Sequence, residues 1–444
     1  MKTFSTKPTD ENVKQSLIKD SLGRRKELRR FVELLDAIDE SCSIALNGDW
    51  GSGKTFFVKQ AKLLVDCLNL DFEIEEKQQI LKLFKMENYN CSVATVYYDA
   101  WINDNNEDPI LSLVHSAIES KQAIIDAEKR GVLFSAGIAI MDFFTDGRVT
   151  SSMEGYEKTR GQNPLESPQK VANIHELVHE FIDALIEEKG NRLIIFIDEL
   201  DRCKPSYAVQ LLERIKHYFD DDRVTFVFSV NLVQLQHTIR SYYGSAFDAT
   251  RYLDKFFDLR VNVPGINYEA LYKHLKFNDR DWVYDANCTQ VAKQLGFSLR
   301  EVERYLRLTR IAHKASSHWQ HAQSSGNAGE MLLYLYIVPL LIGLSMSDMD
   351  MYSEFAKGRN CGHLVELLRN SESFYKEDML AQGEEFSEAI TVEGKIEKIY
   401  STIFGVGQPI MGQKATVGKM RFSAKLKDKA IETVSLLFPD ADYV

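Results

Sequence analysis

Residues 48–55 read Gly-Asp-Trp-Gly-Ser-Gly-Lys-Thr, and they follow the short apolar run 43–46. The stretch fits the phosphate-binding pattern G-x-x-x-x-G-K-[ST] at the end of a strand. Its glycines let backbone N–H groups wrap a polyphosphate without a Cβ clash, and residues 56–68 read as a helix whose N-terminus would point at the anion. A glycine-rich turn is the alternative, but the flanking strand and helix favour nucleotide binding. The predicted nucleotide-binding residues of this loop are Gly48, Asp49, Trp50, Gly51, Ser52, Gly53, Lys54, Thr55 and Phe56.

The composition is that of an ordinary globular protein. The 444 residues are 44% hydrophobic and 27% charged, which is enough for two or three domains with buried cores. The formal net charge of −11 argues against a surface that binds nucleic acid as a whole. The six cysteines include no C-x-x-C pair, which is typical of reduced thiols. The N-terminal residues lack the apolar core of a signal peptide, so we expect a cytoplasmic protein.

Two apolar runs are the candidates for membrane contact. Residues 132–144 and 331–344 are both shorter than the roughly 20 residues that a spanning helix needs. We expect the first run to form a buried hairpin or a partner contact. The second reads as a buried core helix, so no integral membrane span is expected.

Predicted strands alternate with predicted helices from the phosphate-binding loop onward. The strands cover residues 43–46, 93–98, 192–197, 224–230 and 257–263. This alternation predicts an α/β fold with a parallel five-stranded sheet flanked by helices. We expect an N-terminal arm over 1–20, a P-loop domain over 21–265 with an insertion at about 128–170, and an all-helical C-terminal domain over 266–444. Within the insertion, residues 145–170 are rich in Gly, Ser, Thr and charge and predict a long, mobile loop.

An acidic pair follows the predicted strand 192–197. Lys54 can reach the β- and γ-phosphates of a nucleotide, and the Thr55 hydroxyl can bind Mg²⁺. Asp198 is placed to hold the same Mg²⁺ through water, and Glu199 can polarise the attacking water. An acidic loop at a strand end is the alternative. A mononucleotide kinase would not need the glutamate, so its presence favours hydrolysis.

The next predicted strand ends at Asn231, where a polar side chain can touch the γ-phosphate or the water. We expect Asn231 to sense the nucleotide; a helix N-cap for residues 232–240 is the alternative and is compatible with sensing. The guanine-specific pattern N-K-x-D is absent from the sequence, which favours ATP over GTP.

Arginines are candidates to complete the site. Arg251 could act as an arginine finger from a neighbouring subunit, and a surface or salt-bridged arginine is an equal alternative. Arg300 opens a predicted helix of the C-terminal domain and could reach back to the nucleotide. Arg202 more simply braces the acidic loop. Gly23 and Arg24 precede an amphipathic helix and are included among the candidate nucleotide contacts.

A competing pattern lies at residues 175–179. His175-Glu176-Leu177-Val178-His179 is H-E-x-x-H, the zinc-protease pattern on a helix. A zinc site needs a third ligand, and the acidic residues after the strand 192–197 already belong to the predicted nucleotide site. Both histidines fall on the flank of the apolar stripe of their helix, where structural histidines are common. We therefore give a zinc hydrolase low weight.

Residues 414–429 are locally basic in an acidic chain. Contact with a phosphate backbone is one interpretation. A solvated helix face or an acidic protein partner is the favoured one, so nucleic-acid binding is weakly supported.

Taken together, these residues resemble the KAP family of P-loop NTPases. The resemblance rests on Gly-Asp-Trp-Gly-Ser-Gly-Lys-Thr (48–55), Tyr98-Asp-Ala-Trp101, Ile197-Asp-Glu-Leu-Asp-Arg-Cys203 and Arg251-Tyr-Leu-Asp-Lys-Phe256. It covers roughly residues 20–310. It implies a strand between the two nucleotide-binding strands, hence the sheet order 5-1-4-3-2, and a long insertion that carries membrane helices in many members. Members commonly have Asp at the position of Glu199 and often have Asp near Asn231, and both departures here retain polar function.

The leading hypothesis is an ATPase whose nucleotide state, with Mg²⁺, drives a conformational change or assembly with a protein partner or further copies of the chain. A nucleotide-gated scaffold with negligible turnover is the alternative. Some bacterial relatives act in phage exclusion, so the resemblance also implies a role in anti-phage defence by analogy.

Overall fold

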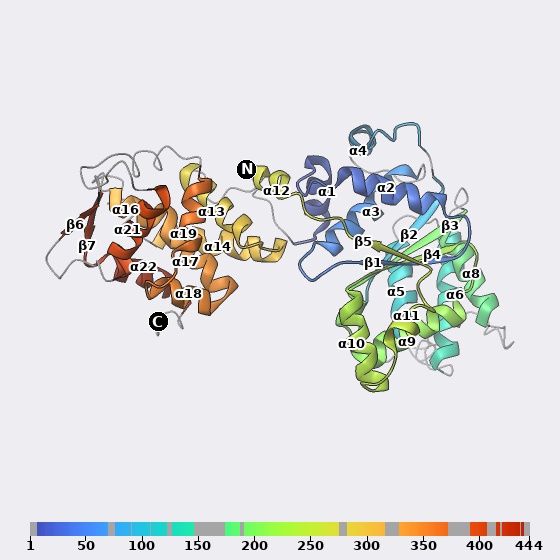
Figure 1. Cartoon of the computed structure of the whole chain (residues 1–444). Helices are drawn as coiled ribbons and strands as arrows, with labels where there is room; N and C mark the ends of the chain where they lie inside the picture. The colour runs from blue at the N-terminus through green and yellow to red at the C-terminus, as the bar shows by residue number, and fades with distance from the viewer. Residues whose placement is uncertain are drawn as a thin grey trace, which may run out of the picture. The chain divides into compact units, whose positions relative to one another are not determined.

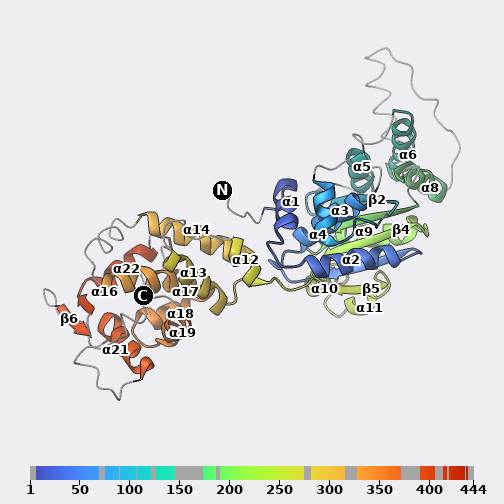
Figure 2. The ribbon, with the colours of Figure 1, turned by 90° about the horizontal axis from the view of Figure 1, so that it is seen from above.

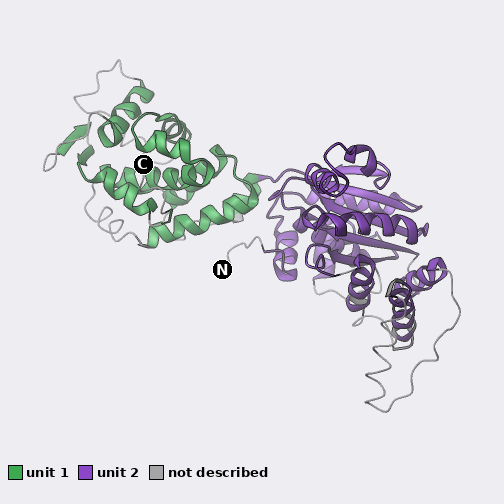
Figure 3. Cartoon of the chain, turned by 90° about the horizontal axis from the view of Figure 1, so that it is seen from below, with its two compact units in different colours: residues 1–6, 268–444 green, residues 7–267 purple. Residues whose placement is uncertain are grey.

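The computed structural model describes most of the chain. The described residues are 7–69, 76–89, 91–106, 108–121, 127–145, 174–186, 191–274, 282–315, 328–371, 391–405, 414–417, 420–435 and 437–438. They divide into two compact units: a first unit in chain order, Lys7–Asn267, which is purple in Figure 3, and a second unit that begins at Tyr268 and is green. Each unit has its own core and is described separately.

The first unit contains a five-stranded sheet. Its strands are β1 (Cys42–Asn47), β2 (Val93–Asp99), β3 (Arg192–Asp198), β4 (Val224–Val230) and β5 (Leu259–Asn262). They are parallel and lie in the order β2-β3-β4-β1-β5 (Figure 1). Read from the other edge this is 5-1-4-3-2, so the predicted fold class and strand order are confirmed. The strand between the two nucleotide-binding strands is β4.

Helices cover both faces of this sheet, as Figures 1 and 2 show. One face packs against α1 (Asp10–Lys19), α2 (Arg25–Ala37), α3 (Lys54–Leu68) and α4 (Lys77–Phe84). The core on the other face is built with α5 (Pro109–Lys121), α6 (Ala127–Thr145), α8 (Ile174–Leu185), α9 (Pro205–Tyr218), α10 (Leu232–Tyr243) and α11 (Ala249–Leu253).

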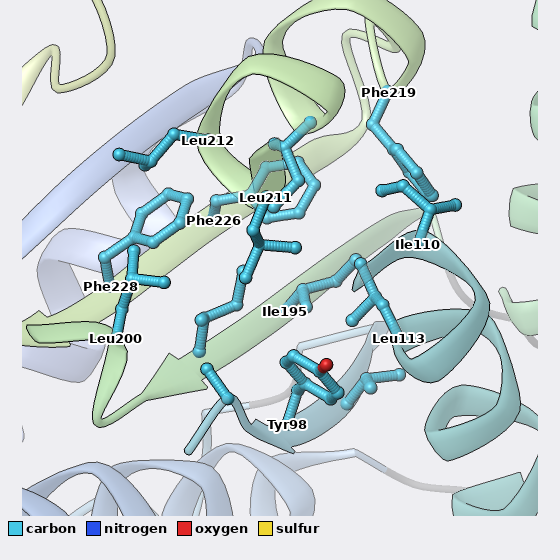
Figure 4. Close-up of a cluster of buried hydrophobic side chains, with 14 of the residues drawn as sticks. Tyr98, Ile110, Leu113, Ile195, Leu200, Leu211, Leu212, Phe219, Phe226 and Phe228 are labelled. Atoms are coloured by element: carbon cyan, nitrogen blue, oxygen red, sulfur yellow. The ribbon is translucent and has the colours of Figure 1, made fainter. Parts of the chain in front are cut away.

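Strand β3 shows why the sheet needs two helical layers. Successive side chains of a strand point to opposite faces. Ile194 and Phe196 enter the α1–α4 core, whereas Ile195 and Ile197 enter the other core. Figure 4 shows Ile195 in this second core, together with Leu211 and Phe226. Every residue of β3 and β4 is buried, which is the pattern of a central parallel strand and explains the uninterrupted apolar runs in the sequence.

The secondary structure predicted for two segments of the first unit, the N-terminal arm and the apolar run 132–144, is wrong. Residues 10–19 of the expected arm form the helix α1, capped by Thr9, and Val13 and Leu17 are buried. The apolar run 132–144 lies in the helix α6 and does not form a hairpin. In both cases apolar residues at helical spacing find a core to pack against, and tertiary packing decides the structure. Of the long loop expected over 145–170, Thr145 ends α6 and residues 146–170 lie outside the described part of the chain.

The second unit is mainly helical. Its helices are α12 (Tyr268–His274), α13 (Trp282–Gln294), α14 (Leu299–Ala315), α16 (Ala328–Leu332), α17 (Val338–Ser347), α18 (Met349–Ala356), α19 (Gly362–Asn370), α21 (Val392–Phe404) and α22 (Leu426–Ser435), with a π-helical turn, η2 (Leu333–Ile337), between α16 and α17.

This unit is not all-helical, which corrects the prediction for residues 266–444. The strands β6 (Lys414–Val417) and β7 (Met420–Ser423) form an antiparallel pair within the basic segment 414–429. A Cβ at Gly329 of α16 would lie 2.5 Å from the backbone oxygen of Arg421, so β7 approaches α16 at a position that only glycine allows.

The continuous helix Ala328–Ser347 is long and apolar enough to cross a membrane by length and composition alone, and it is the one such helix among the described residues. Its apolar window is 78% buried inside the unit. It therefore packs as a core helix, in agreement with the expectation for residues 331–344.

Candidate nucleotide-binding site

The predicted phosphate loop and acidic pair meet at the carboxyl edge of the sheet. Parallel pairing sets Asp99 of β2 opposite Asp198 of β3, and Asp198 opposite Ser229 of β4. The loop after β1 is anchored at the same edge, because Gly48 N–H donates to the Val230 carbonyl at 3.1 Å. The order β3-β4-β1 therefore brings residues from distant parts of the sequence to one place.

The backbone of the loop accounts for its three glycines. Gly51 and Gly53 have φ angles of 79° and 80°, in the left-handed region that favours glycine. A Cβ at Gly48 would lie 2.8 Å from Ser52 Oγ, so this position has no room for a side chain. Helix α3 begins directly after Gly53, so the first N–H groups of a helix lie at the end of the loop.

Lys54 is held inside the loop. Its Nζ donates to the carbonyls of Gly48 at 2.6 Å and Asp49 at 3.1 Å, and the residue is only 8% exposed. Burial lowers the pKa of the ammonium group, and the nearby carboxylates of Asp201 and Asp198 oppose that shift. A buried cation in a ring of backbone dipoles is the arrangement that receives phosphate oxygens.

Asp198 is completely buried at the end of β3. Burial raises the pKa of this carboxyl, while hydroxyl groups that include those of Thr55 and Tyr97 hydrogen-bond to it and oppose the rise. The Tyr97 hydroxyl donates to Oδ2 at 3.0 Å, and the Glu199 N–H donates to Oδ1 at 3.0 Å.

These residues fit a nucleotide with Mg²⁺. Mg²⁺ prefers oxygen ligands, and the Thr55 hydroxyl and the Asp198 carboxylate both supply them. The two groups lie within hydrogen-bond distance of each other. Ser52 Oγ lies buried in the loop with no hydrogen-bond partner among the described residues, which leaves a polar group free for a ligand. The Phe56 side chain is buried in the core, so only its main chain is available to a phosphate.

Glu199 follows Asp198 with an unusual backbone. Its φ angle is 60°, in the left-handed region that non-glycine residues rarely adopt. Arg202 holds its carboxylate, with Nη1 at 2.9 Å from Oε1 and 3.0 Å from Oε2. Burial raises the pKa of Glu199 to about 7, although Arg202 acts in the opposite direction.

Asn231 caps α10, as the alternative interpretation predicted, and its sensing role stays a prediction. Its Oδ1 accepts from the N–H groups of Val233 and Gln234 at the start of α10. Its Nδ2 lies 3.4 Å from Oδ1 of Asp49 in the phosphate loop. The side chain therefore connects α10 with the loop.

Of the candidate arginines in the first unit, Arg24 lies at the loop. It is 2% exposed, and its guanidinium donates to the carbonyls of Ser52 at 2.7 Å and Gly53 at 3.4 Å. Gly23, with a φ angle of 63°, turns the chain just before it. This contact braces the loop backbone, and direct contact with the nucleotide stays a prediction for both residues.

The other two arginines are both exposed within their own units. Arg251 is exposed on α11, and among the described residues no hydrogen bond or ion pair joins its side chain to the phosphate loop. Arg300 is exposed at the start of α14 in the second unit. Their roles as finger and sensor stay predictions.

The H-E-x-x-H helix is the helix α8, and its histidines have other partners. Nδ1 of His179 lies 2.6 Å from the buried Asp221 carboxylate, and His175 packs near the Tyr218 ring. The described residues include no group of three or more His, Cys, Asp or Glu side chains arranged to hold a metal ion.

The structure also adds residues to the site that sequence reasoning did not assign. Tyr97 contacts Asp198, and Trp101 packs under the guanidinium of Arg202. Trp50, expected only as a loop residue, donates from Nε1 to Asp201 at 2.8 Å. The available signal was the Tyr98-Asp-Ala-Trp101 stretch, which carried the family resemblance without a role.

Comparison with known protein families identifies the class of this protein. The model of the KAP family P-loop domain matches residues 24–286, more than half of the chain. This chain belongs to the KAP family of P-loop NTPases. The family assignment implies nucleotide binding, and it agrees with the loop, the acidic pair and the strand order observed here.

The other comparisons add little. We found no match among curated proteins. A solved structure of PCH-2 from C. elegans is 13% identical and covers 70% of this chain, with a TM-score of 0.25. The match spans 65% of the length of that protein. A likeness at this level carries no argument about the present chain.

Proposed function

We propose that this chain is a Mg²⁺-dependent ATPase. The observation that carries the proposal is the meeting of Lys54, Asp198 and Glu199 at one edge of the sheet, next to a loop whose backbone favours glycine. A site that bound nucleotide without turnover would not need a second carboxylate beside the metal-binding one.

Each residue has a distinct task in this proposal. Lys54 and the N–H groups of residues 51–56 neutralise and orient the β- and γ-phosphates. Thr55 and Asp198 would hold Mg²⁺, which supplies charge neutralisation of the phosphates when bound. Glu199 orients the attacking water and accepts its proton, and Asn231 reports the γ-phosphate to α10.

The nucleotide state would then be transmitted beyond the first unit. Asn231 caps α10 and faces Asp49, so a shift of the loop on hydrolysis would move the start of this helix. We propose that such a change drives movement of the helical domain or assembly with a protein partner or further copies of the chain. Arg300 and Arg251 are the candidates to carry that signal. A cytoplasmic location, expected from the cysteine pattern, and a role in anti-phage defence, by family analogy, are part of the proposal.

Phosphate release from Mg²⁺-ATP tests the chemistry. We expect Lys54→Ala to lose nucleotide binding, and Glu199→Gln to bind ATP while losing turnover about 100-fold, because an amide accepts no proton. Glu180→Gln, an exposed glutamate on α8, is the matched control and should be unchanged. Unchanged turnover in Glu199→Gln would refute the assignment of the base.

The second candidate is a nucleotide-gated scaffold without turnover. The contact between Glu199 and Arg202 favours the scaffold, because a carboxylate held by an arginine has fewer acceptor sites for an attacking water. Light scattering with size-exclusion chromatography, with and without Mg²⁺-ATP and beside the phosphate assay, separates the two functions. Assembly on ATP without phosphate release would support the scaffold.

A further inference from the structure

Two tryptophans hold the turn that carries Glu199. The 3₁₀ turn η1 (Leu200–Arg202) follows Glu199 directly. Trp50 donates from its indole Nε1 to Asp201 Oδ2 at 2.8 Å, and the Trp101 ring lies 5.2 Å from the guanidinium carbon of Arg202. The two charged side chains of the turn are thus each held by one indole, one from the phosphate loop and one from the end of β2.

Arg202 passes this constraint on to Glu199. Its Nη1 contacts both carboxylate oxygens of Glu199, at 2.9 Å and 3.0 Å. One nitrogen that bridges two oxygens leaves the outer lone pairs of the carboxylate available for a water molecule. The arginine therefore fixes the direction of the carboxylate without using all of its acceptor sites.

The segment that carries Trp101 is tied to both ends of the same turn. Before the turn, the Ala100 N–H donates to the Asp198 carbonyl at 3.0 Å. After it, the Lys204 N–H donates to Oδ2 of Asp104 at 3.1 Å. These bonds tie the backbone on both sides of Trp101 to the turn, and the Trp101 ring then lies against Arg202.

A purely structural role explains these tryptophans poorly. Trp50 is 51% exposed and Trp101 is 49% exposed, so neither contributes a whole side chain to a core. Half of each ring remains in water, where a large apolar group gains little. What each indole does at its position is to contact a charged residue of the turn: Trp50 donates a hydrogen bond to Asp201, and the Trp101 ring lies against Arg202.

We propose that Arg202 and Trp101 are positioning residues for Glu199, and that Trp50, through Asp201, keeps the turn in register with the phosphate loop. The inference rests on the proposed function, because it assumes that Glu199 orients the attacking water. Misplacement of a catalytic group by about 1 Å can cost on the order of 100-fold in rate, so the contacts matter for turnover more than for ATP affinity.

Steady-state kinetics and ATP titration of six variants test the proposal. We expect Arg202→Ala to lower kcat by about 30-fold and Trp101→Ala by about 5-fold, with the Kd for ATP within about 2-fold of the native value. Arg202→Lys and Trp101→Phe should recover part of the loss, because each keeps one element of the cation–π pair. Ile102→Ala, next to Trp101 and 74% exposed, is the control and should be unchanged. Glu199→Gln serves as the reference for a missing base.

The outcomes separate this inference from the proposed function. If Glu199→Gln abolishes turnover while Arg202→Ala or Trp101→Ala leaves kcat unchanged, the positioning role is wrong and the ATPase stands. If both alanine variants lose ATP affinity as much as kcat, and the conservative variants recover nothing, the contacts are structural and the inference is again wrong. If the native protein binds ATP without turnover, or Glu199→Gln retains turnover, the proposed function fails first and the inference fails with it.

Discussion

The phosphate loop and the H-E-x-x-H helix are two short patterns of similar rarity with opposite outcomes in the structure. At the loop, residues from β1, β3 and β4 converge, and Lys54, Asp198, Glu199 and Asn231 meet at one edge of the sheet. On α8, His179 pairs with Asp221, and the described residues offer no third side chain with which the two histidines could hold a metal ion. The comparison teaches that a motif gains chemistry only where the topology supplies its remaining partners.

Removal of the Asp198 carboxylate, the proposed metal ligand, is the strongest test of the difference between the two patterns. We expect Asp198→Asn to lower Mg²⁺-ATP turnover by about 100-fold or more, because the buried neutral amide cannot balance the cation. Binding of ATP in the presence of EDTA should change little, as measured by fluorescence titration. Asp222→Asn, at an exposed aspartate, is the control. Turnover that survives Asp198→Asn would remove the distinction between the two patterns.

A glycine substitution examines the loop geometry with less severe chemistry. In Gly48→Ala the new Cβ would lie 2.8 Å from Ser52 Oγ and 3.2 Å from Lys54 Cγ, so the loop must shift. We expect the Kd for ATP to rise about tenfold, since the N–H groups would no longer converge on the phosphates. Gly131→Ala is the matched control, because a Cβ there meets nothing within 4 Å. Equal affinities in the two variants would contradict the close packing at Gly48.

The Asp221 pair should affect stability and leave nucleotide chemistry unchanged. Burial raises the pKa of Asp221, but hydrogen bonds from Arg223 and His179 outweigh it and hold the pKa at about 2. A carboxyl with a depressed folded pKa stabilises the fold above its unfolded pKa, and that stability is lost as the pH falls toward the folded value.

We therefore expect Asp221→Asn to lower the free energy of unfolding by about 2 kcal/mol at neutral pH. The difference from the native protein should narrow between about pH 4 and about pH 2. Urea unfolding followed by circular dichroism measures both quantities, with Asp222→Asn as the neighbouring control. A pH-independent difference would show that the effect is not electrostatic.

The smallest effect is expected at the histidines themselves. We expect His175→Gln with His179→Gln to leave ATP turnover within about 2-fold of native and to leave the zinc content of the purified protein unchanged. Elemental analysis and the phosphate assay provide the readouts. Loss of stoichiometric zinc in this double variant would reverse the comparison and revive the hydrolase interpretation.

Much of the fold was predictable because it depends on local patterns. The buried apolar runs of β3 and β4 predict central parallel strands, and the loop 48–55 predicts a strand before it and a helix after it. The errors lie where tertiary packing competes with composition. Residues 10–19 look polar, yet their few apolar side chains complete the core over α3, and β6 with β7 interrupts a region of helical signals.

The site divides in the same way. Its charged residues were predicted from spacing, because phosphate and Mg²⁺ chemistry restricts the residue types that can serve. Arg24 was included among the candidates, but its role at the loop carbonyls depends on a contact over about 28 positions. Trp101 was known only as part of a stretch typical of the family.

The sequence by itself determined the phosphate loop, the acidic pair and the parallel α/β fold. Each depends on residues that are close together in the sequence: the loop on backbone sterics, the acidic pair on ligand chemistry and the fold on hydrophobic periodicity. Only the tertiary structure decided that Trp101 lies under Arg202 and that His179 pairs with Asp221. The first contact depends on the register of β2 against β3 and joins residues that are 101 positions apart in the sequence. The second depends on the packing of α8 and joins residues that are 42 positions apart. No local sequence pattern signals either contact.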